Sequence, residues 1–201
     1  MSTNEFDYYL VYGTNIPNCP AVELDEDENR INYRWAMTSI EDCELVKMRF
    51  VAPYPKKPTM ADFHQDGIVS FFSKKIYDAL QPITLEGAQL LRGEIKDPKN
   101  KKIYEDYYYL HIFNKISCLD RNLSDFDDSI GSDTVLSISK MVLNKDILSN
   151  IPLQERLIFR LGEKSSFQLF HKSVIDAIIA VNPENMRFVK VEDYHFGSAF
   201  D

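Results

Sequence analysis

The side chains best suited to acid–base or metal chemistry in this sequence are its four histidines, His64, His111, His171 and His195. None of them lies three or four residues from another histidine or a cysteine, which is the spacing that zinc sites commonly use. Glycine-rich phosphate loops, nucleophile elbows and zinc-protease motifs are also missing from the sequence. An enzyme built on this chain would have to pair His111 or His171 with a carboxylate such as Asp106 or Asp176. We therefore predict no catalytic residue and no cofactor.

The segment from Asp125 to Asp133 has alternating aspartates that resemble a calcium-binding loop. If Asp125 is the first ligand, Ile130 stands where such a loop needs glycine, and Leu136 stands where it needs a bidentate glutamate. The pattern therefore predicts no metal site. We interpret residues 123–133 as a solvated acidic loop that is available as a charged contact surface.

A second acidic run, Asp25–Glu28, follows the expected strand Phe6–Tyr12, and it is also predicted to stay solvated. The residues that we predict to contact a partner are Asp25, Glu26, Asp27, Glu28, Asp125, Asp127, Asp128 and Asp133.

Charge and composition restrict the class of partner. The 201 residues include 23 Lys and Arg against 31 Asp and Glu, for a formal net charge of −8. Nucleic acid is a poor partner for such a chain, because phosphate binding needs a basic surface, whereas a basic protein would be attracted to it. A charge of this size also serves simply to keep a protein soluble, and the sequence leaves both readings open.

Three features predict a cytoplasmic protein that does not cross a membrane. The segment Met1–Asp7 lacks the basic and then apolar order of a secretory signal. The most apolar run, Val174–Val181, is far shorter than the roughly 20 residues of a spanning helix. Cys19, Cys43 and Cys118 are widely spaced, which favours reduced thiols over a disulfide framework.

Hydrophobic periodicity and turn residues predict an α+β fold with a mostly antiparallel sheet. The expected strands are Phe6–Tyr12, Ile31–Trp35, Leu45–Val51, Ile68–Phe72, Gln89–Lys96, Lys102–Cys118, Val135–Leu143, Leu157–Leu161, Phe167–Phe170 and Met186–Val191. Asp97–Asn100 has the residues of a hairpin turn. In the strand that follows this turn, alternate residues of 107–113 are apolar on both faces, so both faces should be covered. We expect residues 1–60 to pack as a strand and loop region on a domain of residues 61–201, so that the two form one compact unit.

Two segments repeat a strand, a cap and a short helix: Phe72–Leu80 and Phe170–Ile178. Ile76 and Leu80 in the first, like Val174 and Ile178 in the second, have the spacing that turns both side chains toward a sheet. The expected helices are Lys74–Leu80 and Lys172–Val181. The likeness is explained equally well by chance, because such units are common.

Several segments together resemble a bacterial immunity-protein family encoded beside polymorphic toxins, a Myxococcus-type domain first catalogued as a domain of unknown function. The segments that carry the resemblance are Val69–Leu80, Tyr108–Ile112, Ser117–Asp120, Phe159–Leu161 and Phe167–Ile179. The resemblance implies a cytoplasmic protein that binds and neutralises a cognate toxin, with no catalytic residues to carry over. The acidic charge would suit a basic nuclease toxin. The alternatives are a structural or adaptor subunit of a secretion or phage-like assembly, and an enzyme with an unrecognised site.

Overall fold

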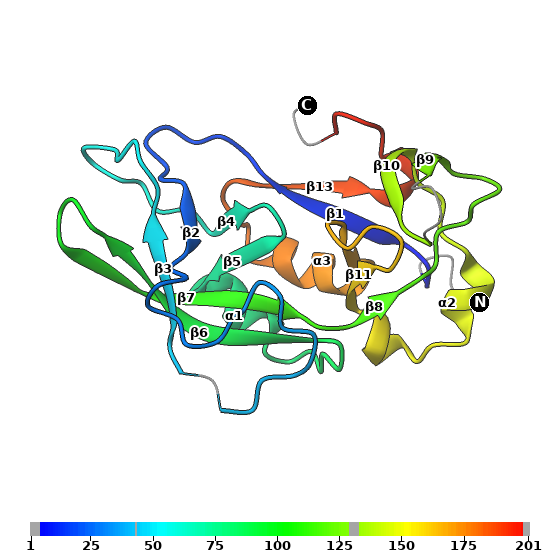
Figure 1. Cartoon of the computed structure of the whole chain (residues 1–201), viewed down its shortest axis with the longest axis horizontal. Helices are drawn as coiled ribbons and strands as arrows, with labels where there is room; N and C mark the ends of the chain where they lie inside the picture. The colour runs from blue at the N-terminus through cyan, green and yellow to red at the C-terminus, as the bar shows by residue number, and fades with distance from the viewer. Residues whose placement is uncertain (1–4, 43, 129–132, 199–201) are drawn as a thin grey trace.

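The computed structural model describes residues 5–42, 44–128 and 133–198. Its strands are β1 (Tyr8–Gly13), β2 (Val22–Leu24), β3 (Val46–Phe50), β4 (Phe63–Asp66), β5 (Val69–Ser73), β6 (Ala88–Asp97), β7 (Lys102–Ile112), β8 (Lys115–Ile116), β9 (Asp125–Asp128), β10 (Val135–Lys140), β11 (Ile158–Leu161), β12 (Gln168–His171) and β13 (Met186–Lys190). Its helices are α1 (Lys74–Leu80), α2 (Lys145–Ser149) and α3 (Lys172–Ala180), with 3₁₀ turns η1 (Leu153–Arg156) and η2 (Val191–Asp193). The fold is therefore mostly sheet with a few short helices, consistent with the α+β class (Figure 1).

Two larger sheets and one ribbon make up the strand framework. The six-stranded sheet has the order β2-β3-β6-β7-β5-β4, the five-stranded sheet has the order β13-β1-β12-β11-β8, and β9 pairs with β10. Neighbouring strands run antiparallel except in two pairs, β3 with β6 and β8 with β11. Residues 1–60 therefore contribute strands to both sheets, β1 to one and β2 and β3 to the other. The expected division of the chain into a region of residues 1–60 and a domain of residues 61–201 stays a prediction.

The two larger sheets share one hydrophobic core, and each has a second core on its other face. On β7, Leu110 and Ile112 enter the shared core, whereas Tyr107 and Tyr109 enter the core on the opposite face. Both α1 and α3 pack into the shared core, through Ile76 and Leu80 and through Val174, Ile175 and Ile178. All residues of β7 from Tyr107 to Ile112 are buried, so the predicted covering of both faces is confirmed.

The structure corrects three predicted elements. Ile31–Trp35 is a turn-rich segment with no neighbouring strand, in which the amide of Tyr33 donates to the carbonyl of Ile31. The predicted acidic loop contains strand β9, because its backbone pairs with β10 and its alternating aspartates leave Phe126 to pack inward. The strand expected to reach Cys118 ends at Ile112, after which the chain forms β8 in the other sheet.

Within the described ranges, none of the helices combines the length and the apolar character needed to span a bilayer.

Candidate partner-binding site

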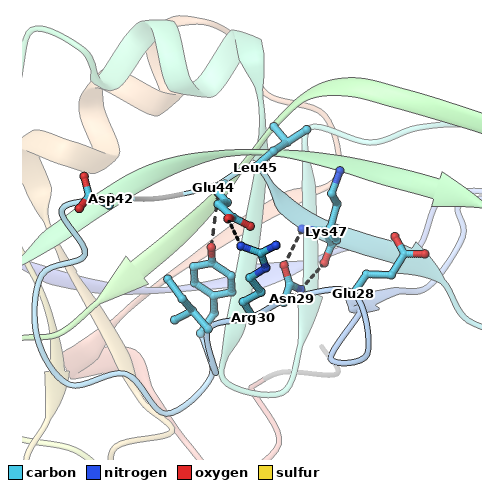
Figure 2. Close-up of a pocket in the computed structure, with 9 residues that line it drawn as sticks. Glu28, Asn29, Arg30, Asp42, Glu44, Leu45 and Lys47 are labelled. Carbon is cyan, nitrogen blue, oxygen red and sulfur yellow. Dashed lines mark hydrogen bonds and ion pairs between the residues drawn. The ribbon is translucent and has the colours of Figure 1, made fainter.

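A surface recess of about 380 Å³ lies between two arms of the connection from β2 to β3 (Figure 2). One arm contributes lining residues between 28 and 33, and the other contributes Asp42, Glu44, Leu45 and, at the start of β3, Lys47. The residues that line it are Glu28, Asn29, Arg30, Ile31, Tyr33, Asp42, Glu44, Leu45 and Lys47. Sequence reasoning identified only Glu28 among them, because the two arms are separated by a segment with no recognisable motif.

Asn29 fixes the first arm to strand β3. Its amide nitrogen donates to the carbonyls of Asp25 and Lys47, both at 2.8 Å, and its amide oxygen accepts from the Lys47 backbone amide at 2.9 Å. Asn29 therefore uses both ends of its amide group to bond the backbone carbonyl and amide of Lys47, as a neighbouring strand would. At the mouth of the recess, Arg30 forms an exposed ion pair with Glu44 at 2.9 Å. Figure 2 shows the contacts of Asn29 with Lys47 and of Arg30 with Glu44, with Asp42 lying apart from them.

Most charges of the recess are already neutralised by neighbours. Lys47 pairs with Glu94 at 2.7 Å, and Glu28 pairs with Lys96 at 2.6 Å. The hydrogen bond from Lys96 lowers the pKa of the Glu28 carboxyl. The lining therefore offers hydrogen bonds and exchangeable ion pairs, which suits contact with polar side chains of another protein.

The acidic run Asp25–Glu28 is less available than the sequence predicted. The side chain of Asp25 is only 6% exposed and lies 3.5 Å from Arg49, so it does not point outward. Asp27 also faces Arg49, Glu26 pairs with Arg34, and Glu28 pairs with Lys96. Each of these four carboxylates thus has a cation beside it.

The three aspartates of β9 are exposed. Asp125 and Asp127 point to solvent, and Asp127 accepts a hydrogen bond from the Ser137 hydroxyl. Asp128 pairs with Arg121 at 2.9 Å, and the same guanidinium donates to the backbone carbonyl of Asp133. Two of the three β9 carboxylates therefore have no ion pair within the described part of the chain.

The structure does not bring the two predicted acidic groups together. The end of β2, where the first group begins, lies toward one end of the long axis, and β9 lies toward the other (Figure 1). One compact interface could therefore include only one of the two acidic groups.

The histidines proposed for an enzyme have other partners. His111 is fully buried, and its Nε2 lies 2.7 Å from the carbonyl of Thr38, to which it must donate. His171 caps α3, where its Nδ1 accepts from the backbone amide of Ser173 at 3.2 Å. Asp176, the carboxylate expected beside His171, accepts from Lys172 instead.

Over residues 5–42, 44–128 and 133–198, no group of three or more His, Cys, Asp or Glu side chains is arranged to hold a metal ion. Residues 129–132 of the calcium-like segment lie outside the described residues.

The fold and the recess together define an α+β protein with an ion-paired polar surface site. Its sequence matches the model of the Immunity protein family (Imm11) over residues 21–193, so the chain belongs to this family of immunity proteins. No curated protein matches the sequence. The family assignment confirms the resemblance derived from the sequence, and it also covers β2, β3 and the recess, which the resemblance did not include.

Proposed function

We propose that this immunity protein binds a cognate toxin in the cytoplasm of the producing cell and blocks it by occupying its surface, without catalysing a reaction. The observation that carries the proposal is the family match, which spans residues 21–193. The free thiols Cys19 and Cys118, whose pKa values are raised by burial, suit a reducing compartment.

The proposal is tested with the toxin encoded by the gene next to this one. We expect the two purified proteins to form a complex on size-exclusion chromatography, and expression of this chain to restore growth of cells that produce the toxin. An immunity protein with no catalytic role should protect in proportion to its concentration and reach full protection at equimolar amounts. Protection by much smaller amounts would contradict inhibition by binding.

The net charge of −8 supports a basic toxin, and a nuclease is the basic toxin class that we propose. The β9 aspartates are the better steering surface, because Asp125 and Asp127 form no ion pair among the described residues, whereas the Asp25–Glu28 run is paired with Arg and Lys side chains.

Replacing Asp125, Asp127 and Asp128 together by Asn is expected to slow association with the toxin by about tenfold at low salt, with little change in dissociation. Exposed charges act mainly through long-range attraction, so the difference should shrink as salt rises. Stopped-flow measurement at two salt concentrations checks this.

A matched control changes three exposed carboxylates elsewhere, as Glu86→Gln, Glu155→Gln and Asp193→Asn. The control has the same net charge as the β9 variant. Equal association rates for the two variants would mean that total charge, and not the β9 surface, steers the encounter.

A further inference from the structure

The connection between β2 and β3 exposes two large apolar side chains, Trp35 and Met37. Trp35 is 65% exposed and Met37 is 52% exposed, and Trp35 is the chain's single tryptophan. Tryptophan is usually well buried in a folded protein, and tryptophan and methionine are enriched where proteins contact each other. These two side chains stand close together in sequence, outside all three hydrophobic cores of the described residues.

The backbone that carries them is tied to the six-stranded sheet on both sides. Before Trp35, the Tyr109 hydroxyl donates to the carbonyl of Tyr33 at 2.8 Å. After Met37, the buried His111 ring donates to the carbonyl of Thr38 at 2.7 Å. Next, the Gln89 side chain bonds both the amide of Ile40, at 2.9 Å, and its carbonyl, at 3.3 Å.

These hydrogen bonds come from side chains of β6 and β7, of which Tyr109 and His111 are buried, and they hold the backbone of an exposed loop. A loop fixed in this way presents Trp35 and Met37 in one arrangement before a partner arrives. Less conformational freedom is then lost on binding, which favours affinity.

The charges around the two side chains indicate the chemistry of the partner. From Trp35 to Leu45 the sequence contains Glu41, Asp42 and Glu44 and no Lys or Arg. Glu41 and Asp42 are exposed and have no ion pair among the described residues, whereas Glu44 pairs with Arg30. An apolar centre with a negative margin is complementary to an apolar pocket bordered by Lys and Arg.

We propose that the loop Trp35–Asp42 is the anchor of the toxin interface, and that Trp35 enters an apolar pocket with a basic margin on the toxin. This inference rests on the proposed function and names the surface that performs it. The loop extends away from the body of the sheets, beyond β6 in Figure 1, so a partner can approach it freely. The loop and β9 lie far apart in Figure 1, so β9 is not part of this interface and acts only through long-range attraction during association, whereas the loop sets dissociation.

The experiment uses the full chain and the purified toxin encoded beside it. Trp35→Ala is expected to weaken binding by at least about 30-fold, mostly through faster dissociation, because buried aromatic anchors dominate binding energy. Met37→Ala should weaken it by a smaller factor. The matched control is Phe196→Ala, which truncates another aromatic side chain that is 75% exposed and should leave binding within about twofold. Unchanged melting temperatures would show that each variant folds, as expected for exposed positions.

A readout without mutation comes from 5-fluorotryptophan, which labels this chain only at Trp35. Its fluorine resonance should shift and lose its sensitivity to solvent when the toxin binds. If the wild-type chain binds no toxin, the proposed function and this inference both fail. If the wild type binds while Trp35→Ala binds equally well and the resonance stays solvent-sensitive, only this inference is overturned. A wild-type dimer that Trp35→Ala separates would also overturn it, because a second copy would then cover the loop.

Discussion

Replacing Arg160 by Ala is expected to lower the free energy of unfolding by about 3 kcal/mol, since three hydrogen bonds from its guanidinium to backbone carbonyls would be lost at roughly 1 kcal/mol each. Arg160 is 5% exposed and lies on β11, in the five-stranded sheet. Its guanidinium donates to the carbonyls of Ile112 at 3.1 Å, Ile68 at 3.2 Å and Ser165 at 3.3 Å. Ile112 ends β7 and Ile68 precedes β5, so this side chain joins the two larger sheets.

Burial lowers the pKa of the Arg160 guanidinium, but the group stays charged at neutral pH. Arg160→Met removes the cost of burying that charge and nearly keeps the volume, so it should destabilise the fold by less than Arg160→Ala. Urea unfolding at pH 7 measures both. The control is Arg30→Ala, whose guanidinium is 84% exposed in its ion pair and should contribute less than about 0.5 kcal/mol. If Arg160→Ala were as stable as the Arg30 variant, backbone bonding by Arg160 would not hold the sheets together.

Acidification from pH 6.5 to pH 4 is expected to cost this protein about 3 kcal/mol of stability through His64 alone. His64 lies on β4 and is 5% exposed, and its burial lowers its pKa to about 4. The unfolded chain has the ordinary pKa of about 6.5, so between these values the unfolded state binds more protons than the folded state. Stability is therefore complete above pH 6.5 and is lost progressively as the pH falls toward 4.

The measurement is the free energy of unfolding against pH for the wild type and for His64→Gln, which has no imidazole to protonate. Other acid-sensitive groups act on both proteins, including His111, whose pKa burial also lowers. The difference between the two curves isolates His64, and it should change by about 3 kcal/mol between pH 7 and pH 4. Parallel curves for His64→Gln and the wild type would show that the folded protein protonates His64 without penalty.

Local sequence determined the elements whose signals are local. The helix predicted at Lys74–Leu80 forms over these residues, because its apolar residues repeat at helical spacing. Ser73, the predicted cap, makes no capping hydrogen bond, and its hydroxyl donates to Asp62 instead. The hairpin of β6 and β7 was also predicted, since the turn at Asp97–Asn100 is stabilised by the Asp97 side chain itself. The resemblance to immunity proteins came from the same kind of pattern, and the family match confirms it.

Tertiary structure alone decided which segments found a strand partner. Ile31–Trp35 has strand-favouring residues and β9 has acidic ones, yet only β9 pairs, because its neighbour β10 supplies the backbone bonds. Strand pairing depends on residues that are distant in sequence, so composition within a segment cannot decide it.

The candidate site depended on tertiary structure for the same reason. Whether an acidic side chain faces solvent is set by the cations that folding brings beside it, as Arg49 is brought to Asp25. Likewise, the sequence contains Trp35 but not the hydrogen bonds from Tyr109 and His111 that hold its loop outward. Composition and neighbouring residues were sufficient to predict the charge, the helices α1 and α3, the hairpin and the family, but not α2. The folded chain decided which charges remain free and which apolar side chains stay exposed, because burial is a property of contacts between distant segments.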